Sequence, residues 1–197
     1  MPSAPADNWD LTSVRNRFEQ CGPRLRRMVA IRMDPRLSAR LDPSDIVQET
    51  FAEALRRLPE YLEHRAIDFY PWLRQLAEQK LIDLHRTHTA QCRSVGREQR
   101  IDGSANSSKQ LARILTKSLS TPSRKLAQRE QSAQITDALA DLSEGDREVL
   151  VLFHLEQLTI SEICQVLGLT EAAVRSRRRR ALERLAGILR SPGESSL

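Results

Sequence analysis

The arginines near the C-terminal end are the residues of this chain with the clearest chemistry. Segment 171–190 carries seven arginines and two glutamates, a balance of +5 that equals the formal net charge of the whole chain. Four of these arginines are consecutive, at positions 177–180. Guanidinium groups bind phosphate through paired hydrogen bonds, and like charges crowded on one helix repel each other unless a polyanion neutralises them. The segment therefore predicts binding to nucleic acid.

Two other segments have a strong charge bias. Residues 73–100 contain six basic and three acidic side chains, whereas residues 41–63 contain six acidic and two basic ones. The basic segment 73–100 predicts another contact with a polyanion, and the acidic segment 41–63 predicts a contact with a basic partner. Solvated helix faces are the alternative explanation for any such charge run.

The aromatic residues are few and unevenly placed. Half of the eight aromatic side chains lie in one short stretch, as Tyr61, Phe69, Tyr70 and Trp72. The next segment is basic and contains Arg74, Lys80 and Arg86. Rings that stack on unpaired bases, beside cations that contact the backbone, are what single-stranded nucleic acid requires. Core filling is the competing explanation for the rings.

Length and composition exclude several classes of protein. The chain has 197 residues, 40% of them hydrophobic and 29% charged, which is typical of one or two globular domains. Its three cysteines are far apart, so we expect no disulfide framework, and its glycines form no phosphate-binding loop. Neither a signal peptide nor an apolar run of roughly 18 residues is present, so we expect a cytoplasmic protein without a membrane segment.

The elements that position these residues are predicted to be helices throughout. Apolar residues recur at steps of three and four over 11–28, and Asp42 and Pro43 begin a second helix that we expect to end before Pro59. A third helix is expected from about residue 71 to 89. Residues 93–128 are rich in serine and predict a linker. The fold class is therefore all-α, with helical domains at 9–92 and 129–190 joined by a flexible linker.

The second domain has the sequence signals of a helix-turn-helix. Ser143 and Asp146 have the spacing of a capping box, and Thr159 and Glu162 form a complete one. Gly168 suits the left-handed position at the end of a short helix, after which a long helix runs to about residue 189. In the DNA-binding form of this motif the second helix enters the major groove.

The alignment with the helix-turn-helix motif assigns the residues of the long helix to different faces. Val174 lies on its inner side, and Thr170 caps its start. The residues expected to face base edges near the helix start are Glu171, Ala172, Ala173, Arg175, Ser176 and Arg179. The residues better placed for phosphates are Arg177, Arg178, Arg180 and Arg184. A packed helical hairpin with a solvated basic face is the alternative.

Three motifs in order give the chain a family resemblance. DPSDIVQETFAEAL at 42–55, WLRQLAEQKLIDLHR at 72–86 and the whole of 142–185 resemble the sigma-70 family. The plan of two domains without additional regions is similar to its extracytoplasmic-function group. The resemblance implies an initiation factor that binds bacterial core RNA polymerase and promoter DNA, both duplex and single-stranded.

The resemblance also implies roles for individual residues. Asp45, Gln48, Glu49 and Phe51 would match region 2.2, which docks on the clamp of the polymerase β′ subunit; the β subunit is the other expected contact. The stretch from Tyr61 to Arg86 would match regions 2.3 and 2.4, which melt the −10 element and hold its non-template strand. Residues 142–189 would match region 4, which reads the −35 element. The linker would follow the RNA exit path, and an anti-sigma factor is a possible further partner.

Other functions have weaker support in the sequence. His85, His88 and Cys92 could supply three metal ligands, but no fourth structural ligand for zinc is evident. A nuclease would need convergent carboxylates, which the spread acidic residues of 41–63 do not provide. A two-domain regulator that binds duplex DNA without polymerase is the remaining class. We therefore expect no metal, no cofactor and no enzymatic activity.

Overall fold

The protein is helical wherever its structure is described. The computed structural model describes residues 9, 11–92, 107–112, 114 and 125–190, and in these ranges only helices and their connecting turns occur. This confirms the predicted all-α fold class. No helix within the same ranges combines the length and apolarity that crossing a membrane would require.

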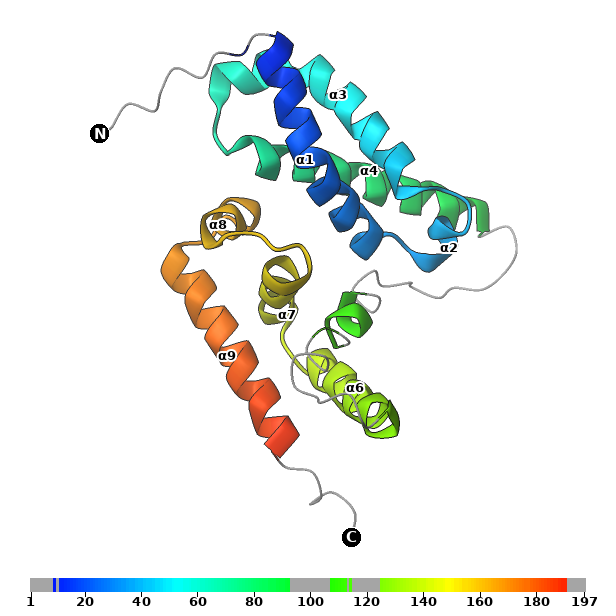
Figure 1. Ribbon diagram of the computed structural model, residues 1–197, viewed down its shortest axis with the longest axis vertical. Helices are drawn as coiled ribbons and strands as arrows, with labels where there is room; N and C mark the ends of the chain where they lie inside the picture. Colours follow the sequence, from blue (N-terminus) through cyan, green and yellow to red (C-terminus); the bar gives the residue numbers. More distant parts are fainter. Residues whose placement is uncertain (1–8, 10, 93–106, 113, 115–124, 191–197) are drawn as a thin grey trace.

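Three long helices and one short helix form the N-terminal half. They are α1 (Leu11–Arg32), α2 (Pro35–Ser38), α3 (Pro43–His64) and α4 (Phe69–Cys92). The long helices α1, α3 and α4 pack against one another in the upper part of Figure 1. Leu25, Met28 and Leu73 are completely buried between them, as expected for apolar residues at helical spacing.

Helix α3 begins as its sequence predicts but ends later. The Asp42 side chain accepts a hydrogen bond from the Ser44 backbone N–H at 2.7 Å, and Pro43 occupies the first turn. The prediction that the helix stops before Pro59 was wrong, because it continues to His64. Proline removes one helical hydrogen bond, but Tyr61 in the next turn packs into the aromatic core and offsets this loss.

Five elements form the C-terminal half. They are α6 (Lys125–Ala140), α7 (Glu144–Leu150), a π-helical turn η2 (Val151–Leu155), α8 (Ile160–Leu167) and α9 (Glu171–Arg190). A short helical segment at 107–112 contributes Leu111, which is fully buried in one cluster with Ile135 and Leu139. Part of the predicted linker thus belongs to the core, while 93–106 and 115–124 lie outside the described residues.

The predicted helix-turn-helix is formed by α8 and α9. The Thr159 hydroxyl accepts from the Glu162 N–H at 3.2 Å, and the Glu162 carboxylate accepts from the Thr159 N–H at 2.9 Å, so the capping box is complete. Gly168 has φ of 63°, the left-handed conformation that favours glycine. The predicted start and end of α8 are confirmed.

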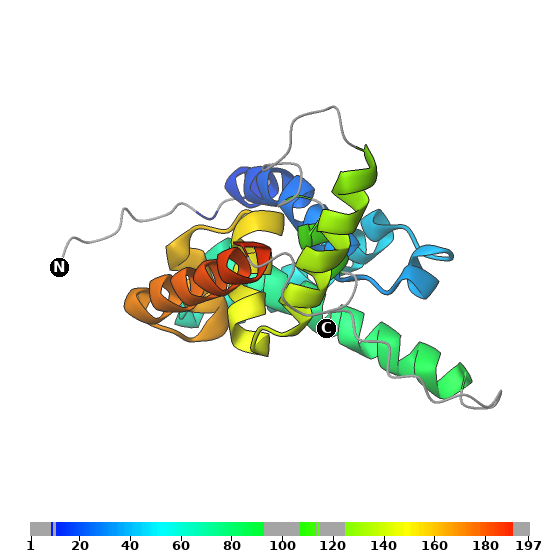
Figure 2. The same ribbon diagram turned by 90° about the horizontal axis from the view of Figure 1, so that it is seen from below.

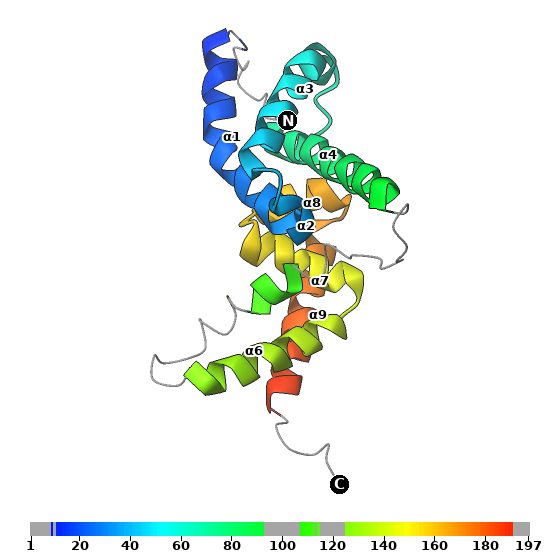
Figure 3. The ribbon, with the colours of Figure 1, turned by 90° about the vertical axis from the view of Figure 1, so that its right-hand side faces the viewer.

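The two halves pack against each other. Met28 and Leu81 of the N-terminal half share one apolar cluster with Leu152, Leu158 and Ile163 of the C-terminal half. Figure 3 shows α7 and α8 directly beneath the N-terminal helices, and Figure 2 shows the same arrangement from below. Helical periodicity predicts each domain but contains no information about contact between them.

The capping box of α8 yields a stability prediction. Thr159→Ala removes the side-chain acceptor for the Glu162 N–H and should lower the free energy of unfolding by about 1 kcal/mol. Ser161→Ala is the matched control, because Ser161 is exposed in the first turn of the same helix. Urea denaturation followed by circular dichroism measures both variants. Equal stability of the two variants would contradict the role of the cap.

Candidate nucleic-acid and polymerase interfaces

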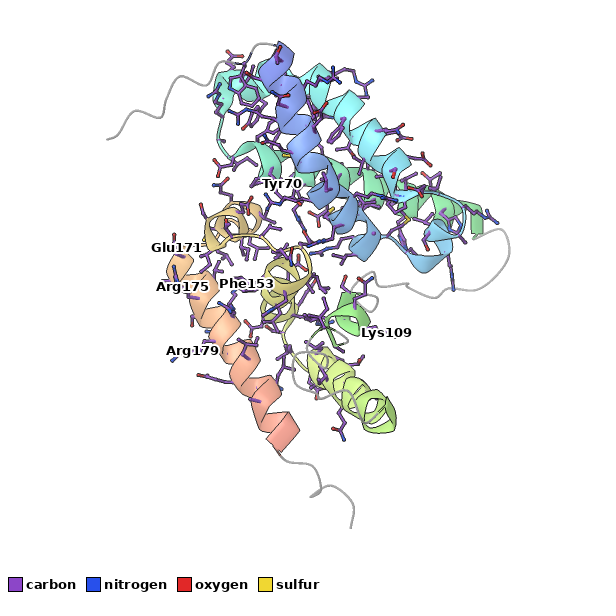
Figure 4. The ribbon with its side chains drawn as sticks, viewed as in Figure 1. Tyr70, Lys109, Phe153, Glu171, Arg175 and Arg179 are labelled. Atoms are coloured by element: carbon purple, nitrogen blue, oxygen red, sulfur yellow. The ribbon has the colours of Figure 1, made fainter. Side chains whose placement is uncertain are left out.

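Helix α9 has one buried side and one exposed side. Val174, Ala181 and Leu185 are at most 4% exposed and pack against the rest of the C-terminal half. The opposite side carries Glu171 and Arg175, which form an exposed ion pair at 3.1 Å. Figure 4 shows Glu171, Arg175 and Arg179 in a row along the outer edge of the helix. This is the side that the sequence assigns to base reading.

The remaining predicted residues of α9 differ in their surroundings. Thr170 caps the helix, since its hydroxyl accepts from the Ala173 N–H at 3.3 Å. Arg180 is exposed and lies 3.5 Å from Asp146 of α7. The guanidinium of Arg178 lies over the ring of Phe153, with its carbon 3.7 Å from the ring centre. Arg178 therefore faces inward and stabilises the helix packing.

The other side chains that the sequence assigns to the same DNA contact fall into two groups. Ala172 and Arg184 are exposed, whereas Ala173, Ser176 and Arg177 are partly buried. The Ser176 hydroxyl accepts a hydrogen bond from Arg180 at 3.1 Å. Ala172 and Arg184 can therefore contact a DNA duplex without a change in conformation.

The aromatic residues of the N-terminal half form one cluster. Tyr61 and Trp72 stack with ring centres 4.3 Å apart, and Phe69 lies 5.3 Å from Trp9. Phe69 is 7% exposed and belongs to the core, whereas Tyr61 and Trp72 are only partly buried. Phe69 thus fits the explanation that the rings fill the core. Tyr61 and Trp72 fit the explanation that they are accessible to unpaired bases.

A hollow of about 440 Å³ opens beside this cluster. Its lining includes Tyr61 and Phe69 and also three residues that the sequence did not single out, Trp9, Arg17 and Arg65. The guanidinium carbons of Arg17 and Arg65 lie 4.5 and 5.1 Å from the ring centre of Trp9. Trp9 lies far from the other aromatic residues in the sequence, so no spacing pattern pointed to it. Its aromatic side chain was the signal that could have singled it out.

The basic residues expected to contact the same DNA strand have different partners. Arg74 is fully buried, with its Nε 2.7 Å from the Glu156 carboxylate. Lys80 lies 3.3 Å from Glu49 of α3, and exposed Arg86 lies 4.0 Å from Asp83. In this conformation Arg86 is the most accessible of the three to a polyanion.

The residues predicted to contact polymerase lie on α3. Asp45, Gln48 and Glu49 are exposed on the outer side of the helix, and Asp45 also accepts from the Asp42 N–H at 3.4 Å. Phe51 turns inward and packs against Phe18 with ring centres 4.7 Å apart. The exposed surface of this site is therefore polar and acidic, and Phe51 supports it from beneath.

Ion pairs between the two halves cover part of the predicted −10 surface. The Glu156 carboxylate, buried at the end of η2, accepts from Arg74 of α4 and from Arg32 of α1, the latter at 2.8 Å. Burial alone would raise the pKa of this carboxyl, but the hydrogen bonds and charges of the two arginines outweigh burial and hold the pKa below its usual value. Tyr70 is buried beside them, and burial raises its pKa.

Two of the three candidate metal ligands, His85 and His88, have described side chains. Among the described residues no three His, Cys, Asp or Glu side chains are placed to hold one ion. His85 lies 3.7 Å from Asp34, and the side chain of Cys92 is outside the described set.

Comparison with known proteins identifies the family. The model of sigma-70 region 2 matches residues 18–91, and that of sigma-70 region 4 matches residues 132–185. The sigma factor CnrH of Cupriavidus metallidurans is 30% identical over 153 residues, which are 78% of this chain and 76% of CnrH. The probable sigma factor RfaY of Xanthomonas campestris is 31% identical over 138 residues, 70% of this chain but 31% of RfaY.

A solved structure supports the same fold. The complex of CnrH with the cytosolic domain of CnrY matches with a TM-score of 0.50 and 22% identity, covering 94% of this chain and 92% of that one.

The chain belongs to the sigma-70 family of RNA polymerase sigma factors, which recognise promoters and initiate transcription. It is also similar to two sigma factors of the extracytoplasmic-function (ECF) group, SigM of Bacillus subtilis at 26% identity over 144 residues and BldN of Streptomyces coelicolor at 25% identity over 154 residues.

A histidine that packs near Arg178 of α9 should make the stability of this domain depend on pH. His154 is half-buried in η2, and burial, followed by the charge of Arg178, lowers its pKa. The unfolded chain therefore takes up a proton before the folded one as pH falls below about 6.5, so the free energy of unfolding should decrease as the pH is lowered further.

The variant His154→Gln removes this group and should flatten the decrease. Thermal melts at several pH values measure it, with His64→Gln, an exposed histidine of α3, as the control. A slope that is unchanged in His154→Gln would contradict the assignment.

Proposed function

We propose that the exposed side of α9 reads the −35 element as duplex DNA. The observation that carries this is the row Glu171, Arg175 and Arg179 on the outer side of the second helix of a helix-turn-helix. Arg180 and Arg184 lie on exposed positions farther along, where contacts to phosphates add affinity without sequence choice. Arg178 would act by positioning the helix.

The −10 element is assigned to the aromatic face of the N-terminal half. Tyr61 and Trp72 offer partly exposed rings for an unstacked base, and the neighbouring hollow has both aromatic and guanidinium walls. Arg86 is available for the strand backbone, whereas Arg74 would have to leave Glu156 and Glu78, and Tyr70 would have to be uncovered by Arg24. Lys80 would contact the DNA strand after its ion pair with Glu49 breaks.

The acidic side of α3 is assigned to core polymerase. Asp45, Gln48 and Glu49 form an exposed polar surface that suits a basic partner, such as the β′ clamp, through complementary charge. The β subunit would contact the C-terminal half, with the linker 93–128 between the domains 9–92 and 129–190.

The protein would thus work by binding, as a non-enzymatic factor in the cytoplasm, where polymerase and promoters are. An anti-sigma partner is supported by the CnrH structure, which was solved with the cytosolic domain of CnrY. Transcription with purified core polymerase tests the whole assignment. Addition of the protein should start transcripts from promoters of the genes induced on its overexpression, and no transcript from any of them would refute it.

Two arginines of α9 should affect DNA binding differently. Arg175→Ala should cost about 1–3 kcal/mol on the cognate −35 element and relax its sequence preference, because Arg175 is placed at base edges. Arg184→Ala should weaken all sequences similarly and reduce the salt dependence by about one counterion. Fluorescence anisotropy of polymerase-bound protein at several salt concentrations measures both. Identical effects on every sequence would contradict the helix register.

Polymerase binding should depend on α3. Gln48→Ala removes an exposed amide from the predicted interface and should weaken binding to core polymerase by about tenfold without loss of stability. Gln134→Ala, an exposed glutamine of α6, is the matched control. Biolayer interferometry with immobilised core enzyme measures both, and equal affinities would show that docking occurs elsewhere.

A further inference from the structure

Trp9 lies just before helix α1 and outside the segment 18–91 that the region 2 model matches. Its ring nevertheless contacts the aromatic cluster of the N-terminal half. The ring centre lies 5.3 Å from that of Phe69 and 6.1 Å from that of Tyr61, and both pairs are edge-on. Such pairs are favourable because the positive edge of one ring meets the negative face of the other. Trp9 therefore connects the start of α1 to aromatic residues of α3 and α4.

The loop 65–68 joins α3 to α4 and is held by contacts to Tyr61 and Trp9. The Tyr61 hydroxyl donates to the Ile67 carbonyl at 3.1 Å, and the Tyr61 carbonyl accepts from the Arg65 N–H at 2.8 Å. The guanidinium carbon of Arg65 lies 5.1 Å from the Trp9 ring centre, within the range of a cation–π contact. Arg65 has φ of 34°, a left-handed conformation that persists for a residue with a side chain only where its surroundings hold it. Trp9 is part of those surroundings.

The same loop sets the geometry of a stacked pair of rings. Tyr61 precedes the loop in α3, and Trp72 follows it in α4, with ring centres 4.3 Å apart and ring planes inclined by 21°. Two hollows, each of about 440 Å³, open beside the loop, and Tyr61, Arg65 and Ile67 line both of them. A shift of the loop would therefore change the angle of the stacked rings and the shape of both hollows.

The Trp9 ring is itself covered. The guanidinium carbons of Arg17 and Arg65 lie over it, at 4.5 and 5.1 Å from its centre. Its indole N–H is buried and has no hydrogen-bond partner in the part of the chain that the structure describes. The packing of the ring, and not a hydrogen bond, thus retains Trp9 at this place. Trp9 therefore acts through its neighbours and does not offer a ring face of its own to a base.

We propose that Trp9 is a positioning residue of the −10 strand site. It holds the loop 65–68 through Arg65, and the loop in turn fixes Tyr61 and Trp72 at the angle that accepts an unstacked base. The proposal rests on the −10 function proposed above for these two rings, whereas the packing of Trp9 on the loop does not depend on that function. The segment before α1 thus belongs to the site, although the region 2 match begins only at residue 18.

Tryptophan fluorescence of the full chain tests the positioning step. The chain has two tryptophans, so Trp72 is the only emitter left when Trp9 is replaced. In Trp9→Ala the Trp72 emission should shift to longer wavelength, because the ring that holds the loop is gone and the stack on Tyr61 loosens. Trp9→Phe keeps an aromatic ring and removes an N–H that makes no hydrogen bond, so its Trp72 emission should stay at shorter wavelength. Equal emission maxima in the two folded variants would overturn the proposal.

A further variant keeps the test valid if Trp9→Ala fails to fold. Arg65→Asn removes the guanidinium that lies over Trp9, and asparagine tolerates the left-handed conformation better than most residues, so the fold should be retained. Added to Trp9→Phe, where Trp72 alone emits, it should shift the emission to longer wavelength. Arg40→Asn, at an exposed position after α2, is the matched control and should not. Unchanged emission in the folded double variant would overturn the proposal.

Strand binding separates this proposal from the proposed function. Bound to core polymerase, Trp9→Ala should bind a short fluorescein-labelled single strand of mixed sequence about tenfold more weakly than Trp9→Phe, because stacking on Tyr61 and Trp72 is weakened. Ile114→Ala should bind as the wild type does, since it also shortens an apolar side chain but at an exposed position outside the N-terminal helices. If the Trp72 emission shifts and the strand affinity stays the same, Trp9 positions the loop and the −10 assignment of the two rings is wrong.

Discussion

The buried ion pair between Arg74 and Glu156 is the interaction on which the arrangement of the molecule depends. A charge without a partner at such a site costs several kcal/mol, and Arg74 meets this requirement with two carboxylates, Glu156 at 2.7 Å and Glu78 of its own helix at 2.9 Å. Arg32 satisfies the second oxygen of Glu156 and links α1 to the same point. One carboxylate thereby links the C-terminal half to two helices of the N-terminal half.

The position of Glu156 depends on local backbone geometry. The π-helical turn Val151–Leu155 ends at Glu156, and Gln157 then takes φ of 59°, an uncommon conformation for a residue with a side chain. This bend directs Glu156 into the contact while Leu155 and Leu158 remain in the core. The turn thus connects two features, since it precedes the helix-turn-helix in the chain and also presents a carboxylate that contacts the N-terminal half.

Features encoded in a few adjacent residues were predictable from the sequence. The cap at Thr159, the left-handed Gly168 and the buried Val174 all follow from short-range spacing, and together they located the exposed side of α9. Pro59 shows the limit of such rules, because packing of Tyr61 outweighs a local helix breaker. The pair of Arg74 and Glu156 joins residues that are 82 positions apart, and no periodicity or capping rule relates them.

The same long-range contact explains why arginines from two basic segments of the sequence have different surroundings in the structure. The arginines of α9 exceed the nearby carboxylates, so several remain exposed, and that excess is what makes the helix suitable for a polyanion. Arg74 instead meets a carboxylate of its own chain. The outer side of α9 is exposed, whereas Tyr70 and Arg74 are buried, so the residues proposed for the two promoter elements differ in their access to solvent.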